Sequence, residues 1–319
     1  MAVVTLTSRR PLALGIVALA ACCLALGIAA GPAFPGSARA QGDAGAVCDE
    51  EFAPGDTWLH LGVNGRNREV LVHVPPLPSA RPVPLLIAIH GWASGAAEFA
   101  GVTGFSRGAD ERGVVVAYPQ GLGHPAGWHF SGLPSTDRSI RQADLALFDA
   151  IVARLTSAGC VDPDRIFVAG HSQGGGMTGE LACRRSDRLA GVAMISGEHF
   201  QLPCRPSHTI PVLSLHAVDD EVLPYGGGHV TTMPRDFPAV LAAEQVAAAW
   251  AAIDGCGSLR PGADEEPGDD VSRISWLGCA AEVDFYRLAS GGHAWASGGP
   301  GRVSASDLVW SLIARSSRG

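Results

Sequence analysis

Short apolar runs of five to eight residues recur along the chain from residue 68 onward, and turn-forming residues separate them. Most of these runs are continuously apolar, which is typical of strands that a sheet buries on both faces. A sheet with both faces covered is therefore expected. The predicted strands span residues 68–74, 84–90, 113–118, 165–169, 189–196, 211–216 and 282–288.

Segments with helical spacing lie between these runs. Apolar side chains recur on one face of the segment 145–155, and residues 175–185, 240–253 and 305–314 are also predicted to be helical. Alternation of strands and helices predicts an α/β fold with a doubly wound, mostly parallel sheet and helices on both faces. The chain has no internal repeat and no proline- or serine-rich linker to a second domain.

The beginning of the chain follows a different pattern. Arg9 and Arg10 precede an uncharged apolar run at residues 11–33, and small residues then occupy the positions that signal peptidase reads before Ala40. This pattern is typical of a secretory signal peptide, and it is compatible with either the Sec or the Tat export route. A membrane anchor is an alternative, because the run is about long enough to span a bilayer. A lipoprotein signal at Cys22 is a second alternative.

The domain organisation predicted from this pattern has three parts. They are a signal peptide at residues 1–40, an N-terminal extension at 41–55 and one catalytic domain at 56–319. Removal of the leader leaves 279 residues, which fits a single α/β domain. We expect a secreted or periplasmic protein without a stable membrane partner.

Composition narrows the chemistry further. The chain has 23 arginines and no lysine, against 31 acidic residues, and its net charge is −8. Without the leader the net charge is −11. This acidic balance argues against a nucleic-acid partner. The absence of lysine excludes Schiff-base catalysis and P-loop phosphate binding, because both require a lysine amine.

Six cysteines remain after the leader, and an even number in an exported protein predicts three disulfides. Cys256 and Cys279 form the favoured pair, because they bracket an acidic, glycine-containing loop at residues 257–272. That loop is interpreted as a solvated surface loop, with a calcium site as the alternative. The spacing of the six cysteines does not match a zinc site, so no metal is expected. The pairing among the other four is open: Cys48, Cys160, Cys183 and Cys204.

The strongest chemical motif is a G-x-S-x-G sequence at residues 170–174. It follows the predicted strand 165–169 directly and opens the predicted helix 175–185. A serine in such a strand-to-helix turn sits above the sheet edge in a strained conformation, next to a helix N-terminus. Ser172 is therefore the candidate nucleophile.

A serine nucleophile needs a base, and the base needs an orienting carboxylate. In this type of fold the acid and the histidine follow the serine in chain order, each after a strand. Adjacent Asp219, Asp220 and Glu221 follow the strand 211–216, and His293 follows the strand 282–288 between glycine-rich and aromatic residues. His293 is the candidate base, and the residues alone leave the choice of acid open.

Two backbone N–H groups are predicted to form an oxyanion hole. One belongs to Gln173, directly after the nucleophile. The other belongs to Trp92, in the loop that follows the strand 84–90, where Gly91 permits close approach of the backbone.

With these residues in place, the chain resembles the secreted poly(3-hydroxybutyrate) depolymerase-like esterases, which are similar to feruloyl and acetylxylan esterases of the α/β-hydrolase superfamily. The resemblance covers roughly residues 56–315 and includes the Cys256 and Cys279 pair. Alignment of the motif around His216 and Pro224 implies that Asp220 is the catalytic acid. The matching blocks lie at residues 84–99, 117–121, 127–128, 143–144, 161–165, 211–228 and 291–295.

The resemblance implies an exported serine esterase that hydrolyses poly- or oligo(3-hydroxybutyrate)-type polyester through a Ser172, His293 and Asp220 triad, without a cofactor. Trp92, Trp128 and Trp295 are expected to form an aromatic wall for the substrate, with packing in the core as an equal alternative for Trp128 and Trp295. Trp92 replaces a small or cysteine residue of the family and is expected to narrow the acyl pocket.

Two alternatives remain open. The first is a feruloyl or acetylxylan esterase that acts on plant cell-wall carbohydrate, and it is favoured by the absence of a polymer-binding module after the catalytic region. The second is a non-catalytic hydrolase-fold binding protein of the cell envelope. The expected partner is a small or oligomeric ester, and the sequence carries no signal for an oligomeric state.

Overall fold

The computed structural model describes residues 48, 52–76, 81–131, 133, 138–198, 203–230, 233, 239–258, 270–300 and 302–316. The predicted signal peptide lies outside the described residues, as does most of the acidic loop between Cys256 and Cys279 with its alternative calcium site. The two predicted catalytic loops, at Ser172 and His293, lie within them.

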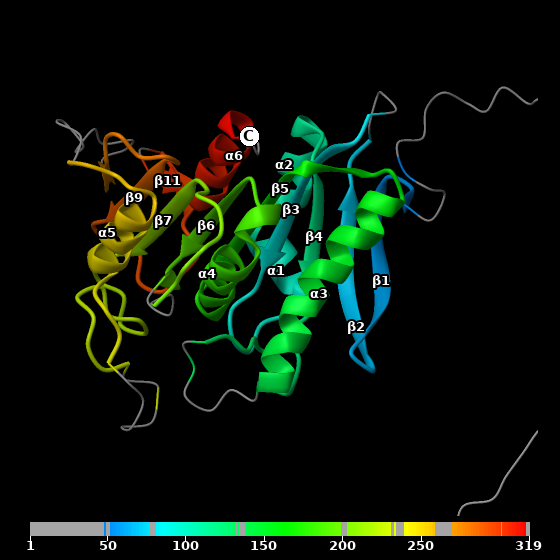
Figure 1. Ribbon diagram of the computed structural model, residues 1–319, viewed down its shortest axis with the longest axis horizontal. Coiled ribbons are helices and arrows are strands. Elements are labelled where there is room, and N and C mark those ends of the chain that lie inside the picture. The colour runs from blue at the N-terminus through cyan, green and yellow to red at the C-terminus, as the bar shows by residue number, and fades with distance from the viewer. Residues whose placement is uncertain are drawn as a thin grey trace, which may run out of the picture. The chain divides into compact units, whose positions relative to one another are not determined.

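A nine-stranded sheet forms the centre of the described part of the chain, as Figure 1 shows. Its strand order is β1-β2-β4-β3-β5-β6-β7-β9-β8. The strands from β4 to β9 in this order are parallel, while β1, β2 and β8 run antiparallel to their neighbours. The bounds are β1 (Gly55–Val63), β2 (Arg66–Val74), β3 (Val83–Ile89), β4 (Val115–Pro119), β5 (Val161–His171), β6 (Gly191–Ile195), β7 (Val212–Ala217), β8 (Val271–Ser275) and β9 (Val283–Leu288).

Helices cover both faces of this sheet. On one face lie α3, α4 and α5, and on the other lie α1, α2 and α6 (Figure 1). A short hairpin of β10 (Ser297–Gly299) and β11 (Arg302–Ser304) precedes α6. The helices span α1 (Ala96–Thr103), α2 (Phe105–Arg112), α3 (Arg138–Ser157), α4 (Gln173–Arg185), α5 (Ala243–Ile253) and α6 (Ala305–Arg315).

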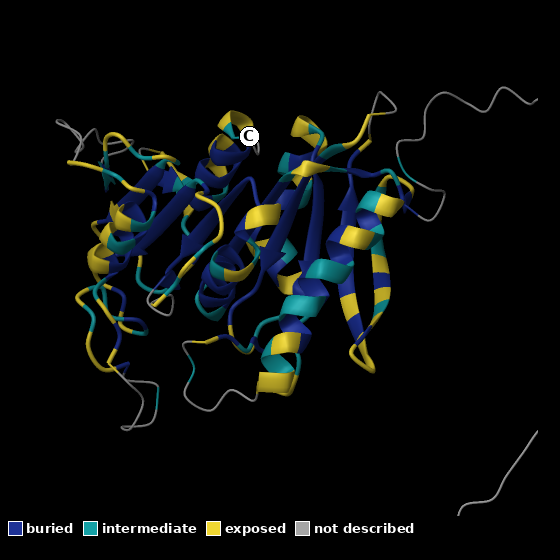
Figure 2. Ribbon diagram, viewed as in Figure 1, coloured by how far each residue is buried: buried dark blue, intermediate teal, exposed yellow. Residues whose placement is uncertain are grey.

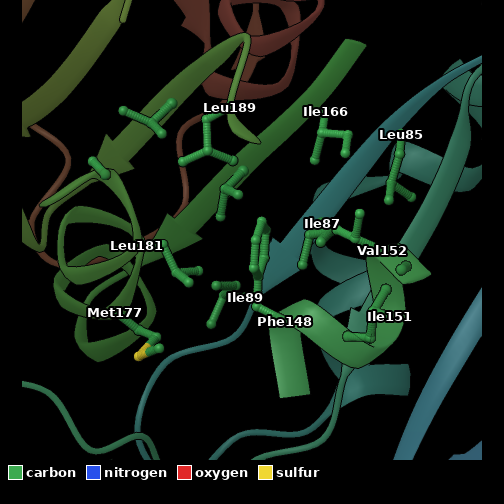
Figure 3. Close-up of a cluster of buried hydrophobic side chains, with 14 of the residues drawn as sticks. Leu85, Ile87, Ile89, Phe148, Ile151, Val152, Ile166, Met177, Leu181 and Leu189 are labelled. Atoms are coloured by element: carbon green, nitrogen blue, oxygen red, sulfur yellow. The ribbon is translucent and has the colours of Figure 1, made fainter. Parts of the chain in front are cut away.

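Alternate side chains of the central strands supply the two halves of the core. In β3, Leu85 and Ile87 belong to the cluster under α3 and α4, whereas Leu86 belongs to the cluster under α1, α2 and α6. Figure 3 shows the first cluster, in which Phe148 of α3 and Leu181 of α4 pack near the β3 side chains. Figure 2 shows that the central strands are buried and that the outer helix faces are exposed. A sheet covered on both faces explains why the central strands are continuously apolar.

The doubly wound α/β fold and all seven predicted strands are confirmed. The sequence pattern missed β1, because as an edge strand it mixes buried and exposed positions. It also missed β8, whose first residues fall inside the predicted loop 257–272, and that part of the loop prediction is wrong. The predicted helix 240–253 begins only at Ala243.

A fully buried ion pair joins the sheet to α3. The Arg68 Nη1 atom donates to Asp144 Oδ1 over 2.9 Å, and both side chains have no exposed surface. The other oxygen of Asp144 accepts the backbone N–H of His129 over 3.0 Å. The pair thereby holds the 128–129 segment against α3, close to the candidate active site.

Three disulfides cross-link the described residues: Cys48–Cys160, Cys183–Cys204 and Cys256–Cys279. The last is the pair favoured by the sequence, and the other two resolve the open pairing. Cys48–Cys160 ties the residues before β1 to the start of β5, across 112 positions of the chain. In the part of the chain that the structure describes, no helix combines the length and hydropathy needed to cross a membrane.

The buried Asp254 at the end of α5 predicts a pH dependence of stability. Its side chain is 1% exposed, its Oδ2 atom lacks a hydrogen-bond partner among the described residues, and burial raises its pKa to about 7. The unfolded carboxyl loses its proton near pH 4, so this residue destabilises the fold progressively as pH rises from about 4 to about 7.

Replacement of Asp254 with asparagine should remove that dependence. Relative to the wild type, the free energy of unfolding of D254N should rise by about 2–4 kcal/mol between pH 4 and pH 8. Urea denaturation at a series of pH values measures this difference. A constant difference between the two proteins at all pH values would contradict the assignment.

Candidate active site

The carboxyl ends of four parallel strands bring the predicted site residues together. Trp92 follows β3, Ser172 follows β5, Asp219 and Asp220 follow β7, and His293 follows β9. In open α/β sheets, ligands bind at this edge because the loops after parallel strands meet there. The chain order of the site residues is therefore a consequence of the sheet topology.

The candidate nucleophile lies in a sharp turn between β5 and α4. Ser172 has φ 55° and ψ −122°, a backbone conformation that residues other than glycine rarely adopt. Its N–H donates to the carbonyl of Ile195 in β6 over 2.9 Å, and Gly197 lies directly against its carbonyl. The strained turn predicted from the G-x-S-x-G motif is present and is held by the neighbouring strand.

The three residues predicted as a triad form one hydrogen-bonded chain. The Nε2 atom of His293 lies 2.7 Å from Ser172 Oγ, and its Nδ1 atom lies 2.8 Å from Asp220 Oδ2. The Oδ1 atom of Asp220 accepts the N–H groups of Val222 and Leu223, each over 2.8 Å. These bonds fix the acid in the geometry that orients a histidine base toward a serine hydroxyl.

The structure separates the two adjacent aspartates that the residue pattern could not. Asp220 has a buried side chain and contacts His293. Burial alone would raise the pKa of Asp220, but hydrogen bonds from His216 and His293 hold it well below its usual range. Asp219 instead accepts the N–H groups of Gly291 and Gly292, over 2.9 and 2.8 Å, and so anchors the loop that carries His293.

Loss of the Asp219 carboxylate should disturb catalysis without unfolding the protein. In D219A the two loop N–H groups lose their acceptor, so His293 should spend less time within reach of Ser172. We expect kcat to fall about tenfold with little change in KM, because geometry and not substrate binding is affected. D219N keeps an oxygen acceptor and should retain most of the activity. Equal losses in both variants would contradict an anchoring role.

The predicted oxyanion loop is held by a buried histidine. The N–H of Gly121 donates to His90 Nε2 over 3.0 Å, so the ring proton lies on Nδ1, which donates to the carbonyl of Gly91 over 2.7 Å. Burial lowers the pKa of His90, which keeps this neutral form. Carbonyl and N–H of one trans peptide point in opposite directions, so this bond aims the Trp92 N–H away from His90.

Neither predicted oxyanion donor has a hydrogen-bond partner among the described residues. The Trp92 N–H follows the anchored Gly91 carbonyl, and the Gln173 N–H is the first of α4, where helical N–H groups have no partner within the helix. Gly91 lies against Ser172: a Cβ atom built on it would be 3.3 Å from the serine Cβ. The two donors therefore flank the nucleophile.

The expected aromatic wall is reduced to one tryptophan. Trp92 is 63% exposed, consistent with contact to a ligand, but Trp128 and Trp295 are buried. The indole N–H of Trp128 donates to the carbonyl of His90 over 2.8 Å, and Trp295 packs edge-on against Phe99 in the core. Trp128 and Trp295 therefore follow the core-packing alternative, and the expectation that they contact substrate is corrected.

Three histidine and acidic residues near the triad were missed as site residues from the sequence. His171 donates from Nε2 to the carbonyl of His293 over 3.0 Å, and burial together with the nearby His293 lowers the pKa of His171 to about 4. Glu198 and His216 continue the series of side-chain contacts beyond Asp220: His216 contacts Asp220, and Glu198 contacts His216. Only their positions beside the motif residues, in G-H-S and at a strand end, indicate such a role.

Known proteins similar to this chain are esterases. A family described as phospholipase/carboxylesterase matches residues 126–233. The chain is 34% identical to "Putative esterase NocK" of Nocardia uniformis subsp. tsuyamanensis over 249 residues, which cover 73% of this chain and 70% of that protein. It is 28% identical to "Probable feruloyl esterase C" of Aspergillus terreus, over 79% of this chain and 84% of that protein.

Other similarities concern part of a relative or the fold alone. Feruloyl esterase B of Piromyces equi is 27% identical over 72% of this chain but only 43% of its own length. The solved acetyl xylan esterase from Aspergillus awamori superimposes with a TM-score of 0.59 over 81% of this chain and 99% of that one. At 14% sequence identity, that match shows the α/β-hydrolase fold.

Proposed function

The chain is an esterase of the feruloyl esterase-like family of α/β-hydrolases, and from this premise we propose that it is a serine carboxylic ester hydrolase with Ser172, His293 and Asp220 as its catalytic triad. One observation carries the proposal. The serine Oγ, the two ring nitrogens of His293 and the carboxylate of Asp220 are connected by bonds of 2.7 and 2.8 Å.

The proposed reaction proceeds through an acyl-enzyme. His293 Nε2 accepts the hydroxyl proton while Ser172 Oγ attacks the ester carbonyl, and Asp220 stabilises the imidazolium that forms. The carbonyl oxygen becomes negatively charged and receives hydrogen bonds from the N–H groups of Trp92 and Gln173. His293 then protonates the leaving alcohol. A water molecule, deprotonated by the same histidine, hydrolyses the acyl-enzyme and regenerates the serine.

We propose a hydroxycinnamate ester of plant cell-wall carbohydrate as the substrate class, in place of the polyester implied by the sequence resemblance. The names of the similar proteins support this choice, because several are feruloyl esterases. The exposed indole of Trp92 also supports it, since its backbone belongs to the proposed oxyanion hole and its ring is available to an aromatic acyl group. Aromatic pairs of this kind contribute about 0.5–1.5 kcal/mol beyond buried area.

A substrate panel tests the proposed specificity. The purified enzyme is assayed with methyl ferulate, an acetylated xylo-oligosaccharide, a 3-hydroxybutyrate trimer and p-nitrophenyl acetate. We expect the largest kcat/KM among the three natural-type esters on methyl ferulate. Preference for the trimer would restore the polyester assignment.

A matched pair of tryptophan variants tests the contribution of the indole. W92A should lower the ratio of kcat/KM for methyl ferulate to that for p-nitrophenyl acetate about 2- to 10-fold. W58A removes another exposed tryptophan, on the edge strand β1, and should leave that ratio unchanged. Equal ratios in both variants would remove Trp92 from the acyl site.

We also propose that the enzyme acts outside the cytoplasm. Three disulfides and the signal-peptide pattern at residues 1–40 support this location, because disulfides persist in oxidising compartments. Expression of the full chain in a bacterial host followed by fractionation tests it. Activity that stays in the cytoplasm, on a chain that keeps its leader, would contradict export.

A further inference from the structure

A buried glutamate–histidine pair continues the candidate triad on the side away from Ser172. Glu198 follows β6, and His216 lies in β7, four residues before Asp220. The side chains of Glu198, His216 and Asp220 have no exposed surface. The catalytic reaction described above assigns no role to this pair.

The bonds within the pair determine where protons lie. The Nε2 atom of His216 lies 2.9 Å from the carbonyl of Leu223 and 3.2 Å from Asp220 Oδ2. Both neighbours are acceptors, so Nε2 carries a proton. The Nδ1 atom lies 2.6 Å from Glu198 Oε1, and Glu198 Oε2 accepts the N–H of Gly197 over 3.0 Å. A carboxylate held in this way favours a second ring proton, on Nδ1.

His216 is thus an imidazolium between two carboxylates. Burial opposes a charge on this ring, but the nearby Glu198 and the hydrogen bonds to Asp220 and Glu198 raise the pKa of His216 to about 10. Asp220 Oδ2 then has two histidine partners, His216 at 3.2 Å and His293 at 2.8 Å. A proton accepted by His293 during catalysis therefore arrives next to an existing positive charge that shares the same carboxylate oxygen.

Other titratable groups face this arrangement from the surrounding elements. His171, at the end of β5, contacts the ring of His293, and its low pKa keeps it neutral. Tyr225 packs edge-on against His216 and bonds to Glu244 of α5, which lies near Arg287 of β9. The pKa of Tyr225 is raised by burial and by Glu244, so its hydroxyl stays neutral. Among the described residues, Glu198 and Asp220 are the charged groups that the structure shows in direct contact with His216.

We propose that Glu198 and His216 are positioning residues that partly neutralise Asp220 and thereby set the pH at which His293 becomes an active base. This inference rests on the proposed function, because Glu198 and His216 act through the triad. With the imidazolium present, protonation of His293 is disfavoured and the enzyme keeps its activity to lower pH. Without it, the full charge of Asp220 acts on His293 and holds a proton there to higher pH.

Two substitutions remove the charge, and the first of them also preserves the packing. In E198Q the amide NH₂ can donate to Nδ1 of a neutral His216 while its oxygen still accepts the Gly197 N–H, so the hydrogen bonds remain and the positive charge is lost. In H216Q a neutral amide donor replaces the ring. E180Q is the matched control. Glu180 lies on α4 and is also buried, but its partners in the described part of the chain are Ser131 and Arg184 and not residues of the triad.

The readout is the acid limb of two rates between pH 4.5 and 8. One is kcat/KM for p-nitrophenyl butyrate, and the other is the rate at which a fluorophosphonate labels Ser172, which requires no turnover. In E198Q and H216Q the midpoint of both limbs should move upward by about one pH unit. At pH 5 the rates, relative to each variant's own plateau, should then fall about tenfold below those of the wild type. E180Q should keep the wild-type midpoint.

The outcomes separate this inference from the proposed function. A uniform loss at every pH with an unmoved midpoint would show a merely structural role and overturn the inference while the esterase assignment stands. A wild-type protein that is neither labelled nor active would overturn both. Should the variants fail to fold, as judged by thermal melting, the ¹⁵N shifts of the wild-type histidines decide. A doubly protonated His216 at pH 8 supports the inference, and a neutral ring overturns it.

Discussion

Replacement of Ser172 with alanine should abolish ester hydrolysis. The change removes the proposed nucleophile, the Oγ that lies 2.7 Å from His293 Nε2, and it leaves the strained turn and both candidate oxyanion N–H groups intact. We expect kcat for p-nitrophenyl butyrate and for methyl ferulate to fall by about 10⁴-fold, which corresponds to about 5 kcal/mol in the activation barrier. The melting temperature should stay close to that of the wild type.

A second serine variant controls for nonspecific effects. S157A removes an exposed hydroxyl at the end of α3, which donates to the carbonyl of Arg154, and it should hydrolyse both esters at the wild-type rate. Full activity of S172A would mean that another group is the nucleophile. A wild-type protein as inert as S172A would favour the alternative of a non-catalytic binding protein.

Replacement of Gly197 with alanine should have the largest effect on stability. A Cβ atom at this position would lie 2.0 Å from the carbonyl oxygen of Ser172 and 2.8 Å from the Cα atom of Gly175. Both contacts involve backbone, so neither can be relieved by rotation of a side chain. The turn would have to move away from β6, and the bond between the Ser172 N–H and Ile195 would break. We expect a loss of at least about 3 kcal/mol in the free energy of unfolding, or no soluble protein.

Gly101 provides the matched control. It lies within α1, and a Cβ atom there would meet no atom within 4 Å. G101A should therefore stabilise the protein by about 0.5–1 kcal/mol, because alanine favours the helix over glycine. Urea denaturation measures both variants, and fluorophosphonate labelling of any soluble G197A reports on the turn. A wild-type midpoint for G197A would refute the close contact between β6 and the nucleophile turn.

Prediction from the sequence succeeded for the central strands and failed at the edges of the sheet. Strands such as β3, β6 and β7 are buried on both faces, so each of them has a mostly apolar sequence that can be recognised locally. The edge strand β1 has only one neighbour and exposes alternate side chains, and its pattern resembles that of a polar loop. The short helices α1 and α2, which are joined at Gly104, were likewise too short for a periodic pattern.

The tryptophans illustrate a different limit of sequence reasoning. Trp92, Trp128 and Trp295 all lie near motif residues, and their proximity in sequence could not decide between substrate contact and core packing for Trp128 and Trp295. Burial distinguishes them, because it depends on elements far away in the chain: Trp128 bonds to His90, and Trp295 packs against Phe99. A tryptophan has an apolar ring and a single N–H donor, so it serves a core or a binding surface equally well.

The amino-acid sequence by itself determined the doubly wound fold, the strained serine turn and the chain order of serine, acid and histidine, because each is encoded in local patterns of apolar, glycine and polar residues. Local residue patterns left the choice between Asp219 and Asp220 open, and the family resemblance implied Asp220 without a physical reason. The tertiary structure supplies that reason, since the choice depends on which carboxylate reaches His293 across 73 positions of the chain. The same holds for Glu198 and His216. Their charges matter because neighbouring parallel strands bury them together, and no local pattern records that proximity.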